Sequence, residues 1–63
     1  MTVSTQLKQT VASLKSAQGN LEAFALQTQN EQAKQLFTNS AQQTKAIVDS
    51  LEQRVSQIEG EEP

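Results

Sequence analysis

The chain lacks cysteine, histidine, tryptophan and tyrosine, and its single proline is the last residue, Pro63. Without cysteine it forms no disulfide, and without cysteine or histidine a structural zinc site has none of its usual ligands. A chain of 63 residues makes one domain at most, residues 1–63, and buries a smaller fraction of its surface than a longer chain does. Self-association or another partner is then the remaining way to stabilise such a small fold.

Clustered positive charge and long apolar runs are also missing. The chain has 5 Lys and Arg against 7 Asp and Glu, a formal net charge of -2, and its basic residues are spread out. Phosphate backbones bind to basic clusters, so we predict no nucleic-acid binding. The longest apolar runs, "AFAL" and "AIV", are far below the roughly 20 residues of a membrane span. The N-terminus lacks the features of a signal peptide, and we expect a cytoplasmic protein with no membrane span.

Apolar residues recur at alternating steps of three and four in two long stretches, a spacing typical of amphipathic helices that pack as in a coiled coil. The first seam is Val3, Leu7, Thr10, Leu14, Ala17, Leu21, Phe24 and Thr28, with Val11 and Ala25 widening the same face. The second seam is Phe37, Ala41, Thr44, Val48, Leu51, Val55 and Ile58, flanked by Ala33, Leu36 and Ile47. These patterns predict two helices, at about residues 4–27 and 30–59.

The segment "LQTQNEQAK" between the two patterns has no apolar periodicity and predicts the turn of a hairpin. Thr28 and Glu31 match a capping box, and Asn30 is the competing N-cap. A short connection between long helices makes them antiparallel neighbours. We expect the second helix to end near Gly60, because glycine is favoured at helix C-termini.

The sequence therefore predicts an all-α fold, an antiparallel two-helix hairpin that dimerises into a four-helix bundle. A homodimer or a higher homo-oligomer is the expected assembly. The residues expected to form the packing and dimer seam are Leu7, Leu14, Leu21, Phe24, Phe37, Val48, Leu51, Val55 and Ile58.

Gly19 and Asn20 form a dipeptide that usually marks a turn, yet the seam keeps its spacing on both sides of them, so we expect the helix to continue. Gly19 is either a tolerated surface glycine or part of a stripe of small residues that another helix could approach closely. This candidate partner face, on the side of the first helix away from the seam, comprises Ala12, Ser16, Gly19, Ala23 and Leu26.

No set of residues in the chain points to catalysis, to a cofactor or to a metal site. Asp49 and Glu52 share a helix face, but Lys45 is placed to form an ion pair with Asp49, so we interpret them as a solvated surface. Thr10, Thr28 and Thr44 on the seams could form a polar network, although such threonines more often bond to a carbonyl of the preceding turn.

The linear pattern also resembles a known family. The "MTV" start, Lys8, Leu14 and Lys15, the segment "LEAFALQTQNEQAK", the segment "LEQRV" and the terminal "EEP" are similar to the small proteins of the domain of unknown function 1657 family of endospore-forming bacteria. The resemblance covers essentially the whole chain. Members of that family commonly continue past "EEP" into a short aromatic-containing tail, and many carry alanine or another helix former near Gly19.

The resemblance implies a sporulation setting, because such proteins are encoded beside spore germination channel components of the SpoVA type. It carries over no catalytic residue. We therefore expect a non-enzymatic interaction or accessory protein of spore formation, germination or heat resistance, located in the cytoplasm or the spore interior. The alternative is a peripheral subunit at the spore inner membrane, docked on an integral spore membrane protein through the small-residue stripe.

Overall fold

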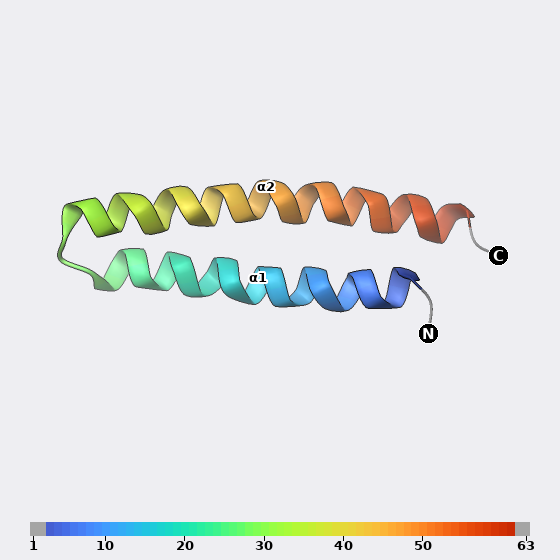
Figure 1. Cartoon of the computed structure of the whole chain (residues 1–63), viewed down its shortest axis with the longest axis horizontal. Helices are drawn as coiled ribbons and strands as arrows, with labels where there is room; N and C mark the ends of the chain where they lie inside the picture. The colour runs from blue at the N-terminus through green and yellow to red at the C-terminus, as the bar shows by residue number, and fades with distance from the viewer. Residues whose placement is uncertain (1–2, 62–63) are drawn as a thin grey trace.

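The structure, a computed structural model, describes residues 3–61 and contains two helices, α1 (Val3–Gln27) and α2 (Glu31–Glu61). They lie side by side and run in opposite directions, joined by a short turn at one end (Figure 1). The predicted all-α fold with two helices packed against each other is confirmed. Both helices begin and end within two residues of the predicted bounds.

The turn is held by polar side chains that bond to nearby backbone. Asn30 is the N-cap of α2, because its Oδ1 accepts a hydrogen bond from the Ala33 amide at 2.9 Å. Its carbonyl also accepts from the Lys34 amide at 2.9 Å, the first bond of the helical ladder. The Thr28 hydroxyl accepts from the Asn30 amide at 3.2 Å and so fixes the turn before the helix. Of the two capping schemes open from the sequence, the structure takes the one centred on Asn30.

Neither glycine interrupts a helix. Gly19 lies inside α1, as the unbroken seam predicts, and Gly60 lies inside the last turn of α2, which ends at Glu61. No residue of the described chain has a positive φ, so α2 does not close on a left-handed glycine. The helix ends next to Gly60, as predicted, although this glycine does not adopt the left-handed conformation of a C-cap.

The face that α1 turns toward α2 differs from the predicted seam by a small rotation. Val11 and Ala25, predicted only to widen the seam, are buried, and so is Ser4. Val3 is 65% exposed and Phe24 is 48% exposed, although both were placed on the seam. The buried residues of α2 are small or β-branched, namely Ala41, Val48 and Val55. Small side chains on both helices let the two axes approach closely.

The hairpin is a thin rod with principal extents of 50 × 17 × 11 Å. Its radius of gyration, 14.6 Å, exceeds the roughly 11 Å expected of a compact domain of this length. Among the described residues no large side chain is fully buried. The two helices therefore share an interface without enclosing a core.

Replacing Asn30 with alanine should lower the free energy of unfolding by about 1 kcal/mol, because the Ala33 amide loses its acceptor at the start of α2. Urea denaturation followed by circular dichroism measures the change. Gln32→Ala is the matched control. Gln32 is exposed and lies two residues after Asn30, so its replacement should leave stability nearly unchanged. Equal stability of the two variants would contradict the assignment of Asn30 as the cap.

Candidate interaction surface

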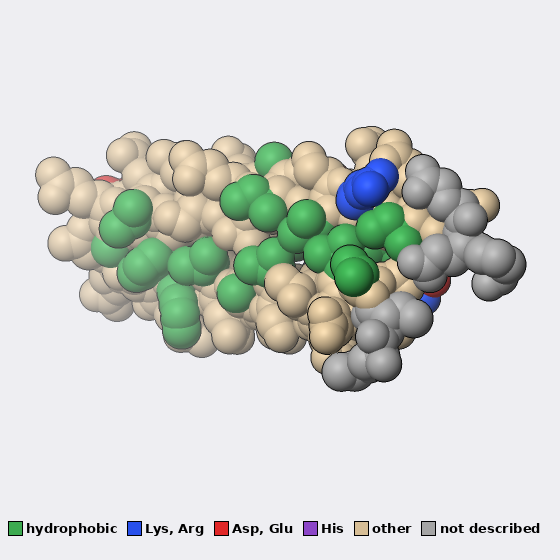
Figure 2. All heavy atoms as spheres, turned by 45° about the vertical axis from the view of Figure 1, so that its right-hand side comes forward, with side chains coloured by type: hydrophobic (Ala, Val, Ile, Leu, Met, Phe, Trp, Pro, Cys, Tyr) green, Lys and Arg blue, Asp and Glu red, His purple; other side chains and the backbone are tan. Residues whose placement is uncertain are grey.

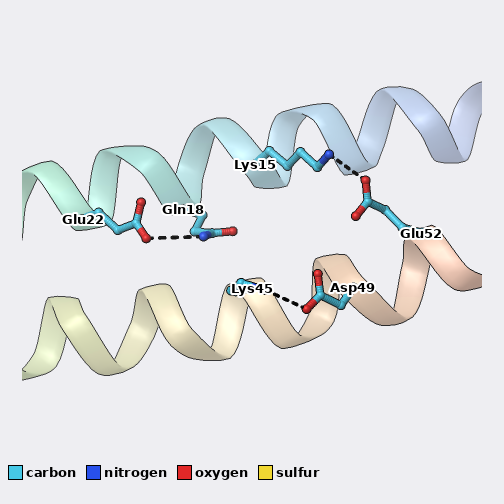
Figure 3. A network of polar contacts seen from close by, with 6 residues as sticks. All are labelled: Lys15, Gln18, Glu22, Lys45, Asp49 and Glu52. Carbon is cyan, nitrogen blue, oxygen red and sulfur yellow. Dashed lines mark hydrogen bonds and ion pairs between the residues drawn. The ribbon is translucent and has the colours of Figure 1, made fainter.

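One side of the hairpin carries the charged side chains that link the two helices. Lys8 forms an ion pair with Glu59, and Lys15 Nζ lies 2.6 Å from Glu52 Oε2. On the same side Lys45 pairs with Asp49 at 3.0 Å within α2, and the Gln18 amide donates to Glu22 at 3.4 Å within α1 (Figure 3). These side chains are about half exposed, so each pair contributes at most about 1 kcal/mol. We call this surface the charged side.

The two carboxylates that the sequence places on one helix face are both held by lysines. Asp49 accepts from Lys45, as predicted from their spacing, and Glu52 pairs with Lys15 of the other helix. Within the described residues no three carboxylate, histidine or cysteine side chains come together as metal ligands would. The arrangement is that of ion pairs on a solvated surface.

The opposite side of the hairpin carries a different set of side chains. Successive helical residues are about 100° apart, so Ala17 leaves α1 about 160° away from Lys15, and Ile47 is separated from Lys45 in the same way. We call this surface the open face. It consists of two rows of exposed or half-buried residues: Val3, Thr10, Ala17 and Phe24 on α1, and Ala33, Ser40, Ile47 and Arg54 on α2.

The open face is apolar over much of its length. Val3, Phe24 and Ile47 are 65%, 48% and 53% exposed, although all three are large apolar residues. The Phe24 ring meets the Phe37 ring with their centroids 5.9 Å apart, which bridges the two helices near the turn. Figure 2 shows hydrophobic side chains gathered in a band along one face of the rod. An exposed apolar band of this kind is typical of surfaces that contact other proteins.

The predicted packing and dimer seam divides between the inside of the hairpin and the open face. Val48 and Val55 are buried between the helices. Phe24 is exposed on the open face. The remaining residues of that set are half-buried along the groove between the two rows: Leu7, Leu14, Leu21, Phe37, Leu51 and Ile58.

The polar residues of the open face are largely neutral. The Thr10 hydroxyl donates to the Gln6 carbonyl at 3.1 Å, and the Thr44 hydroxyl, in the groove, donates to the Ser40 carbonyl at 2.8 Å. Both bonds return to the preceding turn, which is the second of the two roles considered for these threonines. Arg54 is the charged residue of the face among the side chains that the structure describes, and its Nη1 donates to Gln57 Oε1 at 3.2 Å.

The candidate partner face begins on the charged side, where Ala12 and Gly19 line shallow hollows beside Lys15 and Glu52. Ala12, Ser16 and Gly19 are exposed, Ala23 is half-buried, and Leu26 is 85% exposed. A Cβ atom added at Gly19 would meet no atom within 4 Å. Nothing within the hairpin therefore requires glycine at this position.

The division into two sides was missed in the sequence, although a signal for it is present. Lys8, Lys15 and Glu22 follow one another at steps of seven, and so do Lys45, Glu52 and Glu59. A step of seven keeps side chains on one face of a helix. Applying the seven-residue spacing to the charged residues, as well as to the apolar ones, identifies the charged side. The open face is then the side opposite to it.

Comparison with known proteins identifies the family. A family model described as "Protein of unknown function (DUF1657)" matches residues 7–55, most of the chain. The chain belongs to the DUF1657 family. The matched region includes the turn and most of both helices, so the DUF1657 sequence pattern covers the hairpin itself. Searches of curated proteins and of solved structures find no match. Neither helix, within the residues described, is long and apolar enough to cross a membrane.

Replacing Gly19 with alanine should raise the free energy of unfolding by about 0.5 to 1 kcal/mol. The helix gains a better former, and the new methyl group points into open space. Thermal or urea denaturation measures the gain, and Gly60→Ala, in the last turn of α2, should give a smaller one because helix ends fray. A loss of stability in Gly19→Ala would instead indicate that something packs closely against this position.

Proposed function

We propose that this DUF1657 protein is a non-enzymatic helical interaction protein that acts through self-association, with two hairpins packing into an antiparallel four-helix bundle. The observation that carries the proposal is the incomplete core of the hairpin. Its buried apolar residues are Val11, Ala25, Ala41, Val48 and Val55, and none of them is large. Phe37 and the leucines along the groove are only partly buried, and Phe24 on the open face is about half exposed.

The energetics favour assembly over a free hairpin. Burying a large apolar side chain contributes roughly 1.5 to 3 kcal/mol. Val3, Phe24 and Ile47 stay 65%, 48% and 53% exposed, and the half-buried leucines keep a smaller exposed fraction, so part of that contribution is unrealised in the hairpin. In a four-helix bundle each helix has two neighbours, so both the inner interface and the groove become covered. A chain of this size with no disulfide is stabilised most directly in this way.

The non-enzymatic part of the proposal is supported by the side chains available. The sequence has no histidine or cysteine, the residues most used as general bases and nucleophiles near neutral pH. Asp49, Glu52 and Glu59 are each paired with a lysine on the exposed charged side. Pairing of this kind stabilises a surface and leaves these carboxylates without a catalytic arrangement.

The resemblance to proteins of endospore-forming bacteria extends the proposal to an accessory role in spore formation, germination or heat resistance. In that setting the protein would act in the cytoplasm or the spore interior. A fluorescent fusion followed through sporulation tests this extension. Accumulation in the developing spore supports it, and uniform expression during growth with no change in sporulation contradicts it.

A second candidate function is a peripheral subunit that docks on an integral spore membrane protein through Ala12, Gly19, Ala23 and Leu26. The exposure of Leu26, 85%, favours it, because this leucine lies outside both the hairpin interface and the open face. Co-purification with the spore inner membrane that is lost in Gly19→Trp would support this function. An unchanged distribution of that variant would oppose it.

Sedimentation equilibrium tests the self-association directly, and we expect a dimer with a mass about twice that of the 6.9 kDa chain. Leu51→Asp should abolish both the dimer and most of the helical signal, because it places an unpaired charge in the groove. Ser50→Asp, one residue away and exposed, adds the same charge and should leave both intact.

A well-folded wild-type chain that sediments as a monomer at all concentrations would contradict the proposed assembly. Equal behaviour of the Leu51→Asp and Ser50→Asp chains would contradict the role given to the groove.

A further inference from the structure

We infer that the occupant of the open face is a second copy of this chain, which packs its own open face against it and leaves both charged sides in solvent. The inference rests on the proposed self-association and deepens it, because it assigns the contact to one surface. Three observations carry it: the arrangement of the apolar rows, the distribution of charge and the size of the face.

The apolar side chains of α1 form two rows, which is the arrangement expected of a helix that packs against two neighbouring helices. Val11 and Ala25 face α2 of the same chain, and Val3 and Phe24 face outward at the edge of the open face. The half-buried Leu7, Leu14 and Leu21 lie between these two rows. A helix that packs against one neighbour needs a narrow apolar stripe, whereas a helix in a bundle needs a broader one. The outer row of α1 therefore has the position of a second helical contact.

The row of α2 on the same side is complementary in character. Ala33, Ser40 and Ile47 are small or apolar, and Ile47 is 53% exposed. A second hairpin brings the same two rows, so a two-fold axis pairs the face with itself and needs no other protein to match it. The partly buried leucines of both copies would then meet at the centre of the bundle.

The charges oppose every alternative contact between two copies that uses the charged side. Burying the Lys15 and Glu52 pair would remove both ions from water, a cost that the attraction between them does not reliably offset. Among the side chains that the structure describes, two open faces bring together no carboxylate, and the guanidinium of Arg54 lies in the outer row of α2, at the rim of the contact. Arginine at the rim of an interface remains hydrated.

The area is sufficient for a stable dimer. A side of the rod measures 50 by 17 Å between Cα atoms, roughly the 800 Å² that each partner buries in an interface of standard size. The face also runs along the length of the rod, which suits a second rod of the same length better than it suits a compact ligand. These features together point to a second copy.

Single cysteine probes test the assignment, since the natural chain contains no cysteine to interfere. Ala17→Cys places a thiol on the open face, and Ala12→Cys places one on the charged side of the same helix. Both positions are exposed in the hairpin, so an isolated hairpin would react similarly at the two sites. Ala46→Cys gives a second outward control, on α2. Sedimentation of each variant first shows whether the dimer is retained, and the rate of maleimide labelling is then measured under native conditions.

We expect the Ala17→Cys chain to label at least about ten-fold more slowly than the Ala12→Cys chain, since access would require the dimer to open. Both should react at equal rates in denaturant. Equal native rates in a protein that sediments as a dimer would overturn the assignment of the face while leaving self-association intact. Slow labelling at Ala12 with fast labelling at Ala17 would overturn it in favour of the small-residue stripe. A monomer would overturn the assignment and the proposed function together.

Discussion

The structure depends on one constraint, which is that two packed helices share a single interface. Each helix of the hairpin has one neighbour, so only a narrow strip of each can be removed from water. The strip is filled by alanine and valine, and the larger apolar residues remain along its edge. Phe24 and Ile47, both about half exposed, show how much apolar surface such a pair leaves uncovered. A rod of 50 × 17 × 11 Å has no third layer to cover it.

The distribution of charge makes the two sides of the hairpin different, so that the uncovered apolar surface lies on one of them. Within the described part of the chain the ion pairs between the helices lie along one side, where they hold the two helices in register and keep that side hydrated. The other side is left to apolar and neutral polar residues, with Arg54 at its edge. A rod with one hydrated side and one apolar side is suited to pair with another such rod. We propose that the DUF1657 hairpin is one half of a bundle, and that its function follows from what the assembled bundle contacts.

Much of this fold can be read from the sequence, because the spacing of apolar residues is regular. The helices, the turn and the continuity of α1 through Gly19 all follow from the uninterrupted three- and four-residue spacing of the apolar seams. The orientation of α1 about its own axis does not follow. Leu7, Leu14 and Leu21 fit two neighbouring heptad rows equally well, one completed by Val3 and Phe24 and the other by Val11 and Ala25. Only the packing of small residues against Val48 and Val55 selects between them, and that packing is a property of two helices together.

Thermal unfolding at several protein concentrations tests the central claim most directly, because only an assembly has a stability that depends on concentration. For a chain that folds as it dimerises, each ten-fold increase in concentration should raise the midpoint by about 5 °C. Circular dichroism over a hundred-fold range of concentration resolves such a shift. A rising midpoint is the result this account predicts, and a cooperative transition whose midpoint is independent of concentration would contradict it.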